Sequence, residues 1–188
     1  MINAKLGSLL AGAMLAASMA AAAPADEPPA PATTTFKEIQ WDDLIPKDWD
    51  PLKRFRDMNV GAVSDASPRM QELLNQMRDT WDNAPTIAAM NGANVKLPGY
   101  VVPLEEAKGG IKEFLLVPYF GACIHVPPPP ANQIVHVIST RPLKGVRTMD
   151  AVWASGTLHT ARQDSVMGIS GYRMQAAEVV PYTPAAKR

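Results

Sequence analysis

Cysteine is almost absent from this sequence: Cys123 is the only one among 188 residues. No disulfide can therefore form within one chain, which excludes the disulfide-stapled class of small exported domains. An unpaired thiol in an exported protein is buried, bound to a metal, reactive, or linked to a partner. The simplest of these interpretations is a buried, small apolar residue.

Aromatic residues and runs of one charge are also scarce. Aromatics make up 6% of the chain, and 18 basic side chains balance 18 acidic ones. A nucleic-acid or anionic-lipid surface needs a basic cluster, and base stacking needs exposed aromatic rings. The sequence also lacks G-x-S-x-G, H-E-x-x-H, C-x-x-C and a phosphate-binding glycine loop. Nucleic acid is thus disfavoured as a partner, and an enzyme is not indicated.

The N-terminus carries the features of an export signal over residues 1–25. Lys5 precedes the apolar run "LGSLLAGAMLAASMAAAA", and Ala23 and Ala25 fit a small-x-small cleavage site. The run is long enough for a spanning helix to be the alternative. Its richness in alanine and serine favours a cleaved signal peptide. We therefore expect a periplasmic protein with no stable membrane span after cleavage.

The rest of the chain divides by composition. Residues 26–35 are rich in proline, alanine and threonine and predict a flexible linker. Residues 36–66 contain Trp41 and Trp49 among prolines and acidic residues, and predict a strap pinned onto the next domain or, alternatively, a docking segment for a partner. A helix-plus-barrel domain is expected over 67–182, followed by a short tail at 183–188.

One helix is strongly indicated at residues 68–82. Ser67 is a good N-cap, and Pro68 occupies the first helical position, where its missing N–H costs nothing. Apolar side chains then recur at helical spacing up to Trp81, and Asn83 and Pro85 end the pattern. This amphipathic stripe predicts a helix packed against the following domain, with its Met and Trp side chains in the core.

From residue 86 onward the sequence is typical of β-structure, with Gly and Pro separating segments rich in Val, Ile, Tyr, Phe and Thr. Five strand-like segments follow, at 93–104, 111–120, 132–139, 145–160 and 171–182. Their number and spacing predict a mainly β fold. We expect a small five-stranded barrel or curled sheet like the oligonucleotide/oligosaccharide-binding (OB) fold, with the helix packed against it.

The segment "GACIHVPPPPANQIVHV" (121–137) gathers the best metal ligands of the chain. In an extended segment Cys123 and His125 point to the same side, and a fold-back would bring His136 to them. Thiolate and imidazole suit zinc, or copper in its softer state, so zinc is the expected metal. A fourth position could be filled by water, substrate or one further side chain, the candidates being Glu105, Asp150, His159 and Glu178. The same histidines could instead be hydrogen-bonded core residues, or could activate Cys123 as a nucleophile.

The segments "LPGYVVPLEE", "FLLVPYFGACIHVPPPPANQIV", "VWASGTLHT" and "GYRMQAAEV" resemble an uncharacterised exported bacterial family classed as a domain of unknown function. The resemblance covers about residues 36–182. Such proteins are often encoded beside ABC transporters of the lipoprotein-release or macrolide-exporter type, some linked to zinc limitation. The resemblance implies an accessory role in metal handling, without an established reaction. On its motif, Cys123 and His125 are the stronger candidate ligands and His136 the weaker.

The sequence therefore favours a periplasmic accessory protein that binds a transition metal, with zinc as the expected ion, in the service of an ABC transporter or another metal-handling system. An interaction module for an envelope membrane protein is the alternative, because polyproline is a recurring recognition element. A thiol enzyme using Cys123 is a second alternative.

Overall fold

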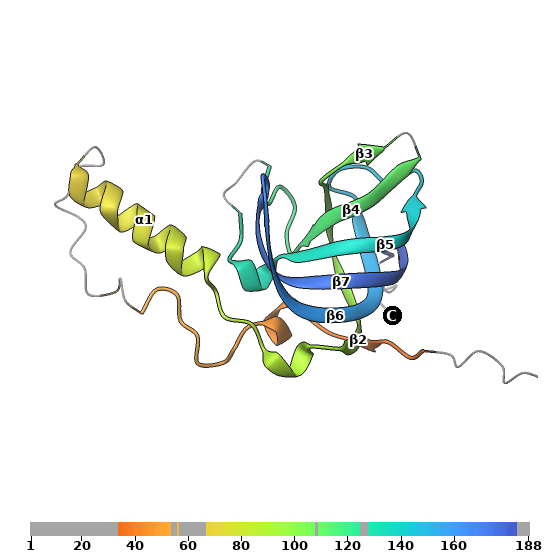
Figure 1. The fold of residues 1–188 in the computed structure, drawn as a ribbon, viewed down its shortest axis with the longest axis horizontal. Coiled ribbons are helices and arrows are strands. Elements are labelled where there is room, and N and C mark those ends of the chain that lie inside the picture. Colours follow the sequence, from red (N-terminus) through yellow and green to blue (C-terminus); the bar gives the residue numbers. More distant parts are fainter. Residues whose placement is uncertain (1–33, 54–55, 57–66, 108, 125–127, 184–188) are drawn as a thin grey trace, which may run out of the picture. The chain divides into compact units, whose positions relative to one another are not determined.

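The computed structural model describes residues 34–53, 56, 67–107, 109–124 and 128–183 (Figure 1). The expected signal peptide and most of the expected linker and tail lie outside these residues. Among the described residues, no helix has the length and apolar character that a membrane crossing requires.

The helix prediction is confirmed in its bounds: α1 spans Pro68–Asp82. The Ser67 hydroxyl accepts a hydrogen bond from the Met70 N–H at 3.2 Å, and Pro68 begins the helix. The Asn83 N–H bonds back to the Asp79 carbonyl and closes the last turn. Local capping interactions are thus present at both ends of α1.

The expected packing of this helix into the core is corrected by the structure. No residue of α1 is buried, and Leu74 is 47% exposed. Met77 and Trp81 are only half-buried. Helical periodicity indicates which face of a helix is apolar but not what covers that face. Here the strands close around a core of their own, so the apolar stripe of α1 is left outside it.

The five strand-like segments all form strands, although the bounds of all five shift, those of β5 and β6 the most. They are β2 (Ala93–Pro103), β4 (Gly110–Val117), β5 (Val135–Leu143), β6 (Ala151–Ser165) and β7 (Gly168–Pro181). Two short strands that the sequence did not indicate, β1 (Lys37–Glu38) and β3 (Glu106–Ala107), pair at the margins. Three short 3-10 turns complete the described elements: η1 (Trp41–Leu44), η2 (Ala88–Met90) and η3 (Ala131–Gln133).

The strands form one mixed sheet in the order β1-β2-β6-β7-β5-β4-β3, and β2 also pairs with β4. The backbone hydrogen bonds therefore run in a ring through β2, β4, β5, β7 and β6. The pairing of β5 with β7 and that of β1 with β2 are parallel, and the others are antiparallel. Figure 1 shows β4, β5, β7 and β6 side by side in this order.

Alternation along the strands separates two apolar clusters. Side chains from every strand of the ring share one cluster, which is therefore its interior and includes Phe114, Val135 and Tyr172. The opposite face of β2 and β4, with the turn after β4 and the residue before β5, carries a second cluster: Val102, Leu115, Val117, Ala122 and Ile134. The N-terminal strap joins the interior through the fully buried Leu44, and the Trp41 indole N–H donates to the Pro98 carbonyl at 2.7 Å. Both faces of β4 are thus covered.

Candidate functional site

Cys123 lies in a turn after β4, not in an extended segment. Its φ is +64°, in the left-handed region that non-glycine residues seldom adopt. The prediction that Cys123 and His125 point to the same side assumed an extended backbone, and that assumption is wrong at Cys123. His125 itself lies outside the described residues.

The turn is held over the second apolar cluster. The Ile124 N–H donates to the Gly121 carbonyl at 3.3 Å, and the Gly121 N–H donates to the Met149 sulfur at 3.1 Å. Cys123, Met149 and Met167 pack against the cluster as partly buried residues. The strained backbone thus places the thiol on an apolar support.

His136 lies on β5, and its ring contacts Glu113. Its ring is 5% exposed, and Nε2 lies 2.7 Å from Glu113 Oε1 on β4. Its Nδ1 is buried and has no hydrogen-bond partner among the described residues. His136 is therefore held as one half of a polar pair.

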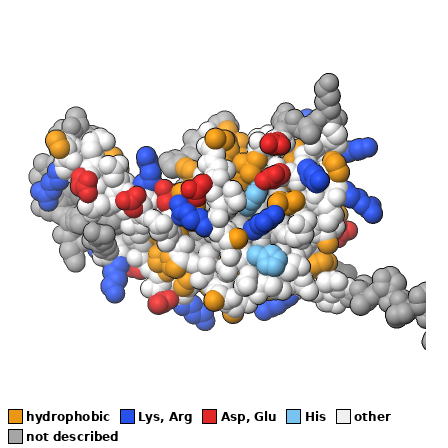
Figure 2. Space-filling view, in the orientation of Figure 1, with side chains coloured by type: hydrophobic (Ala, Val, Ile, Leu, Met, Phe, Trp, Pro, Cys, Tyr) orange, Lys and Arg blue, Asp and Glu red, His pale blue; other side chains and the backbone are white. Residues whose placement is uncertain are grey.

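Charged residues of both signs lie near His136: Glu113 contacts its ring, and Arg173 is its neighbour in the strand register. The strand register sets Arg173 directly beside His136 on one side and beside His159 on the other. Directly opposed residues point to the same face of a sheet. Figure 2 shows the two described histidines on one face with a basic side chain between them. Arg173 and the two described histidines therefore belong to one face of the sheet, and Glu113 is the charged group that contacts His136.

The described residues contain no group of three or more His, Cys, Asp and Glu side chains that could hold a metal ion. The candidates for a fourth ligand are placed elsewhere: Asp150 accepts from the Arg147 N–H at 2.9 Å, and Glu105, His159 and Glu178 are exposed. A site composed of Cys123, His125 and His136 stays a prediction, because His125 is not described.

An open hollow of about 740 Å³ lies beside Cys123. Three separate segments line it: the C-terminal half of α1, the chain at Cys123 and Pro128, and the β6–β7 hairpin from Ser165 to Ile169. Leu74, Met77 and Trp81 of α1 belong to the lining, as does Met167 of the hairpin. The apolar stripe of the helix therefore faces a cavity and not the core.

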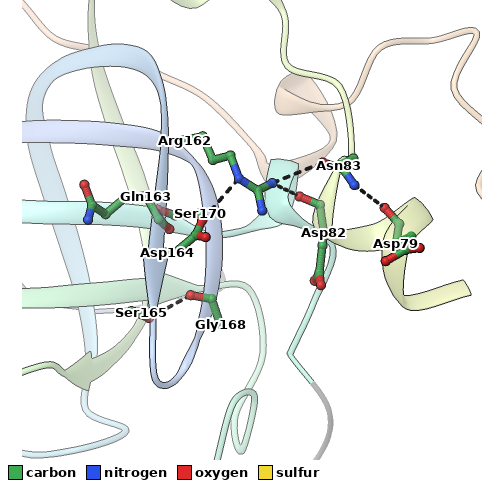
Figure 3. A network of polar contacts seen from close by, with 9 residues as sticks. All are labelled: Asp79, Asp82, Asn83, Arg162, Gln163, Asp164, Ser165, Gly168 and Ser170. Carbon is green, nitrogen blue, oxygen red and sulfur yellow. Dashed lines mark hydrogen bonds and ion pairs between the residues drawn. The ribbon is translucent and has the colours of Figure 1, made fainter. Parts of the chain in front are cut away.

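A polar network ties the end of α1 to β6 (Figure 3). Arg162 donates to the Asp82 carbonyl and, at 3.4 Å, to Asn83 Oδ1, and it pairs with Asp164 at 3.1 Å. At the hairpin, the Ser165 hydroxyl donates to the Gly168 carbonyl at 2.7 Å and accepts from the Met167 N–H. The Arg162 contacts join the end of α1 to β6, and the Ser165 contacts fix the shape of the hairpin.

Burial raises the pKa of the Cys123 thiol to about 11. Burial also raises the pKa of the Tyr119 hydroxyl, and the charge interaction with Cys123 raises it further. A thiol with this pKa is protonated at neutral pH, whereas a nucleophilic cysteine needs its thiolate. Cys123 is therefore a neutral, weakly polar thiol at neutral pH, and it becomes a thiolate ligand only when a metal ion displaces its proton.

This pKa leads to a test of reactivity. With a chelator present, iodoacetamide should alkylate native Cys123 slowly at pH 7, where only about one thiol in ten thousand is ionised. The rate should rise about tenfold per pH unit up to about pH 11, and the urea-unfolded chain should react much faster at pH 7. Mass spectrometry follows the reaction. If the folded protein were alkylated rapidly, at a rate that no longer rose with pH above pH 8, the raised pKa of Cys123 would be contradicted.

Two comparisons place this fold among known proteins. Residues 41–181 match the family described as "Protein of unknown function (DUF3299)". The chain belongs to the DUF3299 family. The crystal structure of a DUF3299 family protein from Pseudomonas aeruginosa PAO1 is 37% identical over 81% of this chain and 100% of that chain, with a TM-score of 0.62. No curated protein matches the sequence significantly.

Within this DUF3299 chain, sequence reasoning selected Cys123 but missed Met77 and Met167. Met77 lies in the apolar stripe of α1, which predicts core packing, and Met167 falls between two predicted strands, where no pattern singles it out. The available signal was the unusual number of methionines, ten in all. Which of them share a cavity depends on tertiary structure.

Proposed function

We propose that this protein is a non-enzymatic, extracytoplasmic accessory protein that binds a transition metal through Cys123. The observation that carries the proposal is the position of Cys123 in the lining of a hollow that it shares with Met77 and Met167. Sulfur ligands are the preferred partners of soft transition metals. All three residues are half-buried, so an ion can reach them from solvent.

Among the residues that the structure describes, no second group is placed to make Cys123 a catalyst. A nucleophilic thiolate needs a base within hydrogen-bond reach. His136 is bonded to Glu113, and burial raises the pKa of the thiol. A thiol enzyme is therefore disfavoured, and metal binding uses the same atom without a reaction.

The fold supports a binding role. The ring of strands consists of a three-strand meander (β2, β4, β5) closed by β7 and β6. We propose that it is an OB-like barrel, an architecture that binds ligands on its surface and in its loops. The sequence features of export over residues 1–25 support a periplasmic location, and the family resemblance supports service to an ABC transporter or metal-handling system.

The metal expected from the sequence is zinc, held by Cys123, His125 and His136. The described residues offer Cys123 without a neighbouring group of three nitrogen, oxygen or thiol ligands. His136 is bonded to Glu113, and among the described residues it joins no group of three that could hold a metal ion. Zinc binding at Cys123 would therefore need His125 as a second ligand. Zinc uptake by the full chain measures whether it occurs.

Metal binding is tested by thermal unfolding of the full chain. At a hundredfold excess over Kd, a ligand specific for the folded state should raise Tm by about 5–10 °C for a chain of this size. Cys123→Ser should remove the rise. His159→Gln, which changes an exposed histidine of β6, is the matched control and should keep it. Equal shifts in the wild type and Cys123→Ser would contradict the proposal.

An interaction module for an envelope protein is the second candidate, favoured by exposed apolar side chains. Phe120 is 66% exposed, and Val166, at the hairpin beside the hollow, is 97% exposed. Exposed apolar side chains mark a contact site only where they form part of a larger apolar patch, so the variants below test whether these two do. If no metal shifts Tm, crosslinking in the envelope should detect a partner whose capture falls in Phe120→Ser or Val166→Ser. Undiminished crosslinking in both variants would contradict this candidate.

A further inference from the structure

Three sulfur-bearing side chains from distant parts of the sequence line one cavity. Met77 comes from α1, Cys123 from the turn after β4, and Met167 from the β6–β7 hairpin. The lining thus combines one thiol and two thioethers, and Cys123 is not an isolated candidate ligand. The sulfur of Met149, which is not part of this lining, accepts from the Gly121 N–H at 3.1 Å.

Each of the three segments is fixed by contacts outside the cavity. Arg162 binds the C-terminal end of α1 and pairs with Asp164 of β6. The Ser165 hydroxyl bonds across the hairpin to the Gly168 carbonyl. The turn at Cys123 rests on the second apolar cluster. The sulfur-bearing residues are therefore presented by a positioned frame, as a ligand site requires.

The chemistry of the lining distinguishes between metals. Thiolate and thioether ligands select Cu(I), whereas divalent zinc is bound mainly through thiolates, imidazoles and carboxylates. No group of three His, Cys, Asp and Glu side chains exists in the described part of the chain. Among its described residues, the lining offers one thiol and two thioethers, which suit Cu(I), and no imidazole.

Charge gives an independent reason. One Cu⁺ bound by one thiolate and two neutral thioethers has no net charge, whereas Zn²⁺ on the same ligands would keep a positive charge. Burying an uncompensated charge is costly in apolar surroundings. Most of the lining is apolar, including Leu74, Trp81 and Ile169, and its charged members Arg78 and Asp82 have opposite signs. The neutral complex suits this hollow better.

We propose that the hollow is a Cu(I) site whose ligands are Cys123, Met77 and Met167. Binding forms a copper–sulfur bond to Cys123 as the thiol proton leaves to solvent, and no electron is transferred. The proposal rests on the metal-binding function inferred above and names its ion and ligands. The chain would accordingly take up reduced, monovalent copper.

The test is an anaerobic Cu(I) titration of the full chain against bathocuproine disulfonate. The wild type should bind about one equivalent. Met77→Leu/Met167→Leu should lower the affinity by at least about tenfold, and Cys123→Ser should lower it further. Met70→Leu is the matched control on the same helix, away from the lining, and should bind as the wild type does. Circular dichroism verifies that each variant is folded.

X-ray absorption at the copper edge gives a second readout, which should show a shell of sulfur neighbours only. Cu(I) binding that is unchanged in the double methionine variant would overturn the ligand assignment. Zinc uptake through Cys123 without Cu(I) uptake would overturn the copper proposal and leave the metal-binding function standing. Uptake of neither metal would overturn both.

Discussion

Tyr172→Ala is expected to lower the free energy of unfolding by about 3–5 kcal/mol, the cost of removing a large, fully buried aromatic side chain. Tyr172 lies on β7 with no exposed surface and belongs to the interior cluster of the ring. Its hydroxyl accepts from the Ile87 N–H at 2.7 Å and donates to the Leu44 carbonyl at 3.0 Å. One side chain thus joins the strap, the segment after α1 and the ring.

Tyr172→Phe measures separately how much the two hydrogen bonds of the hydroxyl contribute to stability. That variant keeps the ring and leaves the Ile87 N–H and the Leu44 carbonyl without their partner, which should cost about 1–3 kcal/mol. Urea unfolding of both variants gives the two values. If Tyr172→Ala lowered the free energy of unfolding no more than Tyr172→Phe does, burial of the aromatic ring would not stabilise the fold, contrary to this account.

Gly156→Ala is expected to destabilise the protein by about 1–3 kcal/mol, through overpacking against backbone. Gly156 lies in β6, where the register with β7 shifts between Ser155 and Gly156. A Cβ at this position would approach the Ala176 Cα to 2.8 Å and contact the Gln175 carbonyl oxygen more closely still. Backbone atoms of a paired strand cannot move aside as a flexible side chain can, so β6 and β7 must separate locally.

The control for this prediction is Gly109→Ala, since a Cβ at Gly109 would meet nothing within 4 Å. Its effect should stay within about 0.5 kcal/mol. Thermal or urea unfolding compares the two variants. Equal stability of Gly156→Ala and the wild type would mean that the two strands are not so closely paired at the bulge.

Local signals explain which parts of the fold were predictable from sequence. The bounds of α1 follow from Ser67, Pro68 and Asn83, all of which act within one turn of the helix end. The five strands follow from runs of β-branched and aromatic residues. The boundaries of β5 and β6 were less accurate, because tertiary pairing extends β5 through Pro142 and β6 through charged residues such as Asp164.

Tertiary relations explain what sequence reasoning missed. The apolar stripe of α1 does not reveal that Met77 faces a hollow. The period-two argument for Cys123 assumed an extended backbone, whereas its φ is +64°. The cross-strand position of Arg173 beside His136 depends on a parallel pairing of β5 with β7, which strand patterns alone do not specify. Two of these three relations concern the candidate site itself.

The central claim, metal binding through Cys123, is tested most directly by elemental analysis. The purified full chain and its Cys123→Ser variant would be incubated with zinc or with Cu(I), freed of unbound metal, and measured side by side. The account predicts about one equivalent of metal, copper in preference to zinc, on the wild type and none on the variant. A wild type that retains neither metal, or a variant that retains as much as the wild type, would contradict it.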